Sequence, residues 1–326
     1  MIIVDVHSHC FPNNYLKELK KIHAGDPAAD FSDIPEWGVT EKRVNRMDEL
    51  GIKVQILGVS VPNVYHQDVE ISKSLAQICN DEIAEICRIY PDRYLGLASI
   101  PIDDMSYAVD ELDRAITKLG LDGVILGTNI AGTPLSDDRY VPFFEEMNRR
   151  NVPLVLHPMN AIGDERMPDD YRKFHLNVYV GRFFSTSRII GHMVFRGVFE
   201  RLSDLVLIIP HAGGAIPFLC PRWDMVYSHK IPKTHYDILP YPPSHYLKRH
   251  YFDTALSYQH TCLRGTLDLC GIDRLVFGVD TPFGEMLLPE EMESINTFGL
   301  SDEEREKLFY KNAMKIFPKL ENINMK

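Results

Sequence analysis

The chain has 326 residues, of which 45% are hydrophobic, so it can bury a large core as one α/β domain or as two ordinary ones. Its net charge is −11, its pI is near 5.6, and no block of Lys or Arg stands out. This charge balance argues against a surface for nucleic acid or an anionic membrane, and we expect a small-molecule partner.

The cysteines and the hydropathy pattern indicate the cellular compartment in which the protein works. The sequence lacks C-x-x-C spacing, and its six cysteines are typical of reduced core residues. The N-terminus enters an apolar strand pattern without the basic region and long apolar stretch of a secretory signal. No uncharged apolar stretch reaches the roughly 18 residues of a membrane span. We therefore expect a soluble, cytoplasmic protein with no membrane segment.

Eight short β-rich runs follow one another along the chain. They lie at 2–6, 53–58, 94–99, 123–126, 152–156, 205–209, 250–253 and 274–278. Helical patterns lie between them, with apolar residues three and four apart, at 68–90, 104–119, 139–150, 188–202 and 257–270. Strands that alternate with helices predict a parallel sheet, and eight such units predict a (β/α)8 TIM barrel. An open doubly wound sheet is the alternative.

We expect residues 1–326 to form a single domain of the metallo-dependent hydrolase type. Two long connections, at about 10–40 and 158–185, follow the first and fifth predicted strands. Long connections after barrel strands are where such a fold builds its substrate pocket.

Two histidines, His7 and His9, close the first strand. Residues two apart on a strand point the same way and can bind one metal ion together. The pattern H-x-H is weak evidence alone, but three further candidates also stand at predicted strand ends. His157 ends PLVLH, His211 ends LVLIIPH, and Asp280 ends RLVFGVD. Because the carboxyl ends of barrel strands form one rim, we expect all five side chains to share one pocket.

The chemistry of these side chains indicates a metal centre. We assign His7, His9, His157 and Asp280 as ligands, because imidazoles with one carboxylate suit Zn²⁺, with Mn²⁺ or Fe²⁺ as feasible substitutes. His211 is then the general acid/base beside a metal-bound water. The predicted fourth strand, GVILGTN, has no lysine at its end, which disfavours a second metal bridged by a carbamylated lysine. We therefore predict one metal ion.

Nearly the whole chain resembles the amidohydrolase superfamily, in the branch around aminocarboxymuconate-semialdehyde decarboxylase. The resemblance rests on DVHSH (5–9), VNRMDELGIKVQIL (44–57), VPLVLHP (152–158), RGVFERLSDL (196–205), HAGGAIPF (211–218) and FGVDTPFGE (277–285). It implies a (β/α)8 barrel and one divalent metal, usually zinc, held by the positions of His7, His9, His157 and Asp280. It also implies that His211 is the catalytic base.

The same resemblance implies an activity and a role for Arg222. The branch mostly performs nonoxidative decarboxylation of aromatic or muconate-type acids, so we expect a metal-dependent carboxy-lyase in which His211 and Asp280 are catalytic. Arg222 matches an arginine that reaches into the neighbouring subunit's pocket and binds a substrate carboxylate, which implies a homodimer or a higher homo-oligomer.

Two other functions remain open from the sequence. A hydrolase of an ester, lactone, amide or C–C bond would use nearly the same site but would need donors that polarise a carbonyl group. The cations Arg182, Arg188 and Arg222 favour the decarboxylase, because they suit an acid substrate. A binding protein that has lost catalysis is disfavoured, because all five site residues are present.

Overall fold

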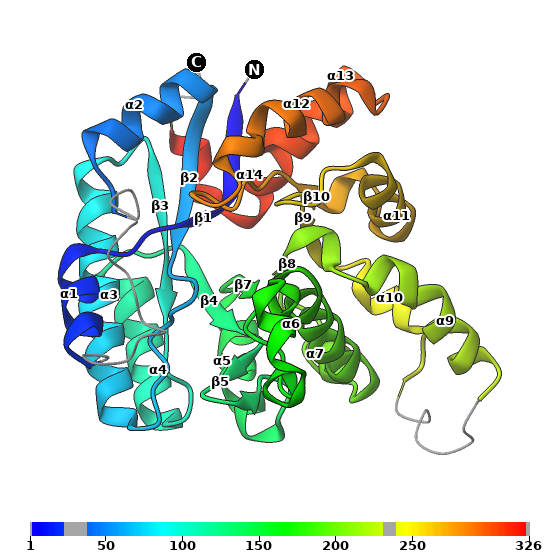
Figure 1. The fold of residues 1–326 in the computed structure, drawn as a ribbon, viewed down its shortest axis with the longest axis horizontal. Helices are drawn as coiled ribbons and strands as arrows, with labels where there is room; N and C mark the ends of the chain where they lie inside the picture. The colour runs from blue at the N-terminus through cyan, green and yellow to red at the C-terminus, as the bar shows by residue number, and fades with distance from the viewer. Residues whose placement is uncertain (1, 23–37, 231–238, 324–326) are drawn as a thin grey trace.

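Eight parallel strands form the centre of the molecule, and helices surround them (Figure 1). The computed structural model describes residues 2–22, 38–230 and 239–323. The strands pair in chain order: β1 (Ile3–His9), β2 (Ile52–Gly58), β3 (Tyr94–Ser99), β4 (Gly123–Gly127), β7 (Leu154–His157), β8 (Leu207–Ile209), β9 (Tyr251–Asp253) and β10 (Leu275–Val276). A short antiparallel hairpin, β5 (Asn129–Ile130) and β6 (Thr133–Pro134), follows β4.

The last strand returns to the first and closes the barrel. The Val6 N–H donates to the Phe277 carbonyl at 3.0 Å, and the His9 N–H donates to the Thr281 carbonyl at 2.8 Å. All eight predicted strands are present at their predicted places. The predicted TIM barrel is therefore confirmed, and the open doubly wound sheet is wrong.

The helices largely follow the predicted pattern, and some bounds differ. They are α1 (Asn13–Ile22), α2 (Glu41–Leu50), α3 (Val69–Ile89), α4 (Met105–Asp113), α5 (Val141–Arg150), α6 (Asp169–Lys173), α7 (Phe183–Phe195), α8 (Val198–Arg201), α9 (Ile216–Ser228), α10 (Pro243–Leu247), α11 (His260–Cys270), α12 (Leu288–Thr297), α13 (Asp302–Glu306) and α14 (Asn312–Ile316). The helix predicted at 188–202 begins earlier and is interrupted, because Gly197 takes a left-handed φ of +69° between α7 and α8.

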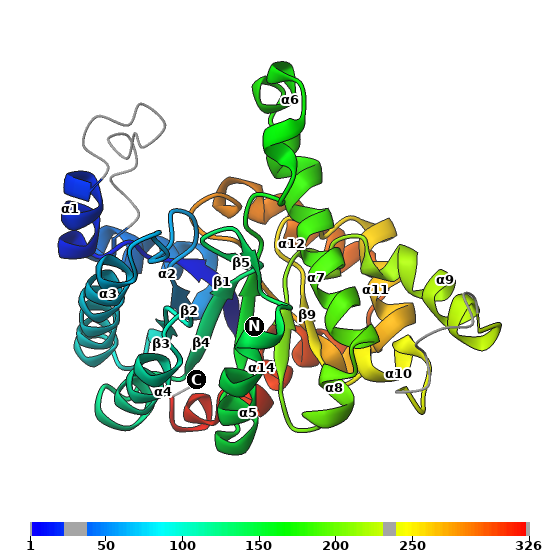
Figure 2. The same cartoon turned by 90° about the horizontal axis from the view of Figure 1, so that it is seen from below.

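The two long connections contain helices. Helix α1 lies in the first, and 23–37 of that segment lie outside the described residues. The second contains α6 and a π-helical turn, η4 (Asn177–Arg182), and α6 stands away from the barrel (Figure 2). Helix α6 has acidic residues in its first turn and basic residues in its last, which complements the helix dipole.

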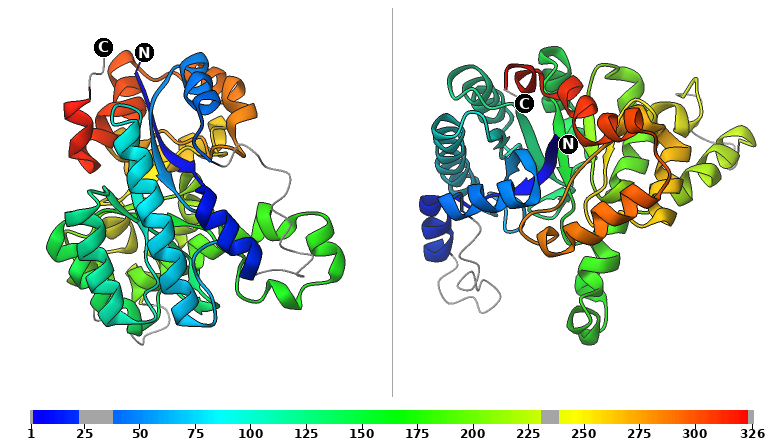
Figure 3. Two further views of the ribbon diagram at one scale, coloured as in Figure 1. Left: turned by 90° about the vertical axis from the view of Figure 1, so that its left-hand side faces the viewer. Right: turned by 90° about the horizontal axis from the view of Figure 1, so that it is seen from above.

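Two apolar layers fix the barrel. One lies between the strands and the helices, and the other fills the barrel interior with alternating strand residues such as Val4, Val6, Val54 and Ile56. The C-terminal segment belongs to the inner layer through Phe317 and its neighbours, at the end of the barrel where β1 begins (Figure 3). Because apolar side chains fill that end, polar side chains gather at the opposite end, where the strands finish.

The structure also bears on two features expected from the sequence, the membrane segments and the cysteines. Within the described ranges, no helix combines the length and apolar character needed to cross a bilayer. All six cysteines are free thiols, three of them buried: Cys10, Cys79 and Cys220.

Candidate metal centre

A bulge in β1 points both histidines of the first strand into the barrel. Asp5 pairs with Gln55 on β2 and Ser8 pairs with Leu57, so β1 carries one more residue than β2 over this stretch. Val6 belongs to the apolar barrel interior, and strict alternation would turn His7 outward toward the helices. The extra residue re-aims the strand, so that His7 and His9 point into the pocket at its end.

The carboxylate of Asp280 reaches the same place from the turn after β10. The Asp280 N–H donates to the His7 carbonyl at 2.8 Å, which ties the two chain segments together. Asp280 has a φ of +63°, a conformation that a non-glycine residue rarely adopts. Buried Asp5 supports this turn, because its carboxylate accepts hydrogen bonds from the Val279 N–H (2.9 Å) and the His7 N–H (3.1 Å). Strained backbone held in this way is typical of functional sites.

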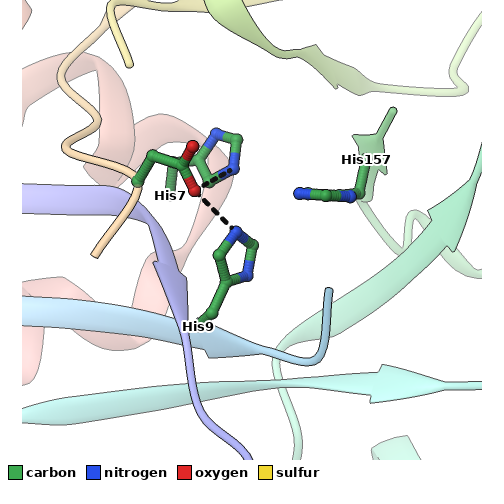
Figure 4. Close-up of side chains that lie close together, drawn as sticks. His7, His9 and His157 are labelled. Carbon is green, nitrogen blue, oxygen red and sulfur yellow. Dashed lines mark ion pairs between the residues drawn. The ribbon is translucent and has the colours of Figure 1, made fainter. Parts of the chain in front are cut away.

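Three imidazoles and one carboxylate converge on one point. The four side chains, His7, His9, His157 and Asp280, each offer a ligand atom within 4.8 Å of the others, and all four are buried. Asp280 Oδ1 lies 2.9 Å from His9 Nε2 and 3.5 Å from His7 Nε2. Figure 4 shows the His157 ring edge-on, with a ring nitrogen turned toward the other two histidines.

The donor atoms fit a divalent metal ion. His7 Nε2, His9 Nε2, His157 Nδ1 and Asp280 Oδ1 are all buried and make no hydrogen bond. Two ligands about 2.1 Å from one ion lie about 3.0 Å apart at a right angle and about 3.4 Å apart at the tetrahedral angle. The two observed separations lie within about 0.1 Å of the ends of this range, and a shared ion would satisfy the donor atoms of His7, His9 and Asp280.

Hydrogen bonds to the far side of the rings fix which nitrogen faces the site. His7 Nδ1 lies 2.8 Å from Asp253 Oδ2, and His9 Nδ1 lies 3.3 Å from the Gly58 carbonyl oxygen. A carbonyl oxygen and a carboxylate accept hydrogen bonds, so each Nδ1 carries the proton. In the neutral ring, each Nε2 is then left with a lone pair for a metal.

Burial and charge set the protonation of the ligands. Burial lowers the pKa of His7, but Asp253 and Asp280 outweigh it and raise the pKa to about 9. Burial is also the main cause of the lowered pKa values of His9 and His157. Burial raises the pKa of Asp280, but His7 and His9 together hold it below its usual range. The carboxylate is therefore charged, and a metal must displace a proton from His7.

His211 lies beside this cluster and is held on three sides. Its ring stacks on His7, with centroids 5.1 Å apart, and on Phe183 at 5.5 Å. Its Nδ1 donates to the Ala255 carbonyl at 2.9 Å, which leaves Nε2 able to accept a proton. Burial lowers its pKa, so the ring is neutral at pH 7. The backbone is left-handed here, with a φ of +55° at His211 and +53° at Ala212.

Comparison with known proteins assigns the family. The family model described as Amidohydrolase matches residues 4–319. The chain belongs to this amidohydrolase family. It is 30% identical over 333 residues to the 2-amino-3-carboxymuconate-6-semialdehyde decarboxylase of Dictyostelium discoideum, and the match covers 95% of this chain and 90% of the relative.

Solved structures share the amidohydrolase fold. The 5-carboxyvanillate decarboxylase LigW of Sphingomonas paucimobilis superposes with a TM-score of 0.88 at 23% identity, over 97% of this chain and 98% of the other. A 5-carboxyvanillate decarboxylase of Novosphingobium aromaticivorans, complexed with manganese and 4-hydroxy-3-methoxy-5-nitrobenzoic acid, gives a TM-score of 0.86 at 21% identity, over 97% and 96% of the chains. Both likenesses show the same barrel.

The structure brings five of the six predicted site residues of this amidohydrolase together. The sixth, Arg222, lies exposed on α9, and neither a hydrogen bond nor an ion pair links it to the cluster among the described residues. The sequence reasoning missed Asp253, which is fully buried and bonded to His7. Its signal was available, because it ends the predicted strand HYFD in the way that His157 ends PLVLH.

Proposed function

We propose that this amidohydrolase is a metal-dependent nonoxidative decarboxylase of an aromatic or muconate-type carboxylic acid. The observation that carries the proposal is His211, a buried neutral imidazole with an available Nε2, stacked directly on a residue of the three-histidine, one-carboxylate cluster. The decarboxylase relative, 30% identical over 95% of this chain, supports the same reaction class.

One divalent ion would be held by His7, His9, His157 and Asp280. When bound, it supplies a Lewis acid that orients an anionic substrate and activates water. The nitrogen-rich donor set suits Zn²⁺, and the manganese in the carboxyvanillate decarboxylase structure supports Mn²⁺ as well. Asp253 and the Gly58 carbonyl keep the first two rings in the tautomer that leaves Nε2 free.

His211 performs the proton transfer in this proposal. Cleavage of the bond to the carboxylate carbon releases CO₂ and leaves an electron pair on the substrate carbon, which must accept a proton. His211 Nε2 takes a proton from the substrate or from water and delivers it to that carbon. Stacking contacts with the rings of His7 and Phe183 help to hold the imidazole in place.

Arg222 acts in this proposal across the interface of a homodimer or higher homo-oligomer. It lies on one face of α9 with Phe218 four residues before it and Met225 three residues after it, and these are 86% and 45% exposed. An exposed apolar patch is typical of a surface that a partner covers. We propose that a second copy of the chain covers this face and that the Arg222 guanidinium reaches the substrate bound to that second copy. We also propose that the enzyme works in the cytoplasm.

The test is CO₂ release from a panel of hydroxybenzoic, carboxyvanillic and muconate-type acids, with metal content measured in parallel. We expect release by the native enzyme, loss of release with full metal content in His211→Ala, and loss of both metal and release in Asp280→Ala. Absence of release from every acid, together with cleavage of esters or lactones, would replace the decarboxylase with a hydrolase.

A further inference from the structure

Arg182 directly precedes Phe183, a residue that contacts His211 beside the metal centre. It ends the π-helical turn η4, and the next residue, Phe183, stacks on the His211 ring with a 20° angle between the planes. The hydroxyl group of Ser185, three residues after Arg182, lies 2.7 Å from the hydroxyl group of Thr128. This contact fixes the start of α7 above the end of β4. Contacts on both sides of the barrel mouth therefore fix the backbone of Arg182.

The Arg182 guanidinium has no anionic partner in the described part of the chain. No carboxylate among the described residues lies within 4.0 Å of it, and its Nε is buried without a hydrogen bond. Arg188, six residues later on α7, also has no carboxylate within 4.0 Å among the described residues, but it is exposed and donates to the Ile162 carbonyl at 3.2 Å. A partly buried cation without a partner is costly unless an anion joins it.

Arg182 interacts electrostatically with two of the candidate metal ligands, Asp280 and His157. Burial lowers the pKa of Arg182, and Asp280 is the charged group that raises it. Burial is the main cause of the low pKa of His157, and the charge of Arg182 adds to it. A metal ion on Asp280 would neutralise the negative charge that stabilises the guanidinium, so the guanidinium would then need an anion from elsewhere.

We propose that Arg182 is a specificity-determining residue that binds the carboxylate of the substrate from within the same chain as the metal centre. This inference rests on the proposed function for the identity of the substrate. The binding of a carboxylate by Arg182 does not depend on the reaction that follows. A planar guanidinium can bind a carboxylate through two parallel hydrogen bonds, which an ammonium group cannot reproduce. This role is separate from that of Arg222, which would come from the neighbouring copy.

The test compares two ligands that differ by one carboxylate, in proteins loaded with Mn²⁺. The acid is 4-hydroxy-3-methoxy-5-nitrobenzoic acid, and its counterpart without the carboxyl group is 2-methoxy-6-nitrophenol. Calorimetry gives the Kd of each for the native protein, Arg182→Gln, Arg182→Lys and the control Arg188→Gln. Circular dichroism and metal analysis check the fold and the ion content of every variant.

We expect Arg182→Gln to bind the acid about 10-fold to 100-fold more weakly while its affinity for the phenol stays the same. Arg182→Lys recovers part of the loss, and Arg188→Gln matches the native protein. Equal acid affinity in the native protein and Arg182→Gln, at equal metal content, would overturn the proposal, as would a native protein that does not distinguish the two ligands. If the native protein binds the acid through Arg182 but releases no CO₂ from any substrate, the decarboxylase proposal fails and the carboxylate site stands.

Discussion

The substitution Asp253→Asn tests how the fold prepares His7 for a metal ion. Asp253 Oδ1 accepts hydrogen bonds from two backbone N–H groups, those of His211 at 2.7 Å and Ala255 at 3.1 Å, and Oδ2 faces His7 Nδ1 at 2.8 Å. An asparagine must keep its carbonyl oxygen against the two backbone donors, because its NH₂ group there would leave both without an acceptor. Its NH₂ group then points at His7.

This orientation reverses the tautomer of His7. With a donor facing it, Nδ1 must accept, so the ring proton moves to Nε2, the atom that faces the metal site. Loss of such a supporting hydrogen bond typically costs about 10-fold to 100-fold in metal affinity, or about 1.4–2.7 kcal/mol. The fold is retained, since the two backbone donors keep their acceptor.

Competition with a fluorescent chelator measures this affinity for Zn²⁺ and Mn²⁺. The matched control is Asp268→Asn, which makes the same change at an exposed position of α11 and should leave the affinity at the native value. If Asp253→Asn binds both ions as tightly as the native protein, the reasoning about the tautomer is refuted.

Three further predictions concern stability and packing. Burial lowers the pKa of His250 from 6.5 to about 3, so its stabilising contribution is complete above pH 6.5 and is lost as the pH falls toward 3. Between pH 7 and pH 5, the free energy of unfolding measured with urea should therefore fall by about 2 kcal/mol more for the native protein than for His250→Asn. In Gly278→Ala the added Cβ would lie 2.9 Å from the His7 Cβ, so chelator competition should show weakened metal binding, whereas Gly265→Ala, with its nearest contact at 3.5 Å, should not. Phe317→Ala should cost about 3–5 kcal/mol in unfolding free energy and leave metal affinity unchanged, because Phe317 lies at the other end of the barrel.

The barrel and the cluster could be predicted because each signal is local. Every strand is a short apolar run with helical periodicity after it, and the candidates His157, His211 and Asp280 each follow such a run directly. A parallel barrel places all these strand ends on one rim, so residues far apart in sequence meet without any long-range information.

The features that the sequence did not reveal depend on contacts between segments. Strict alternation from Val6 turns His7 outward, and only the pairing with β2 shows the extra residue that turns it in. The buried carboxylate of Asp253 becomes meaningful once His7 lies 2.8 Å away. The sequence offers Arg182 only as one of three cations that suit an acid substrate, and its lack of an anionic partner in the described part of the chain appears only in the structure.

The most direct test of the metal-dependent decarboxylase is a titration of the metal-free protein with Mn²⁺ or Zn²⁺ while CO₂ release from the best acid of the panel is recorded. We predict that CO₂ release rises linearly with added ion and reaches its plateau at one ion per chain. Release that does not depend on the ion, or a protein that binds one ion per chain and releases no CO₂ from any acid, would contradict the account.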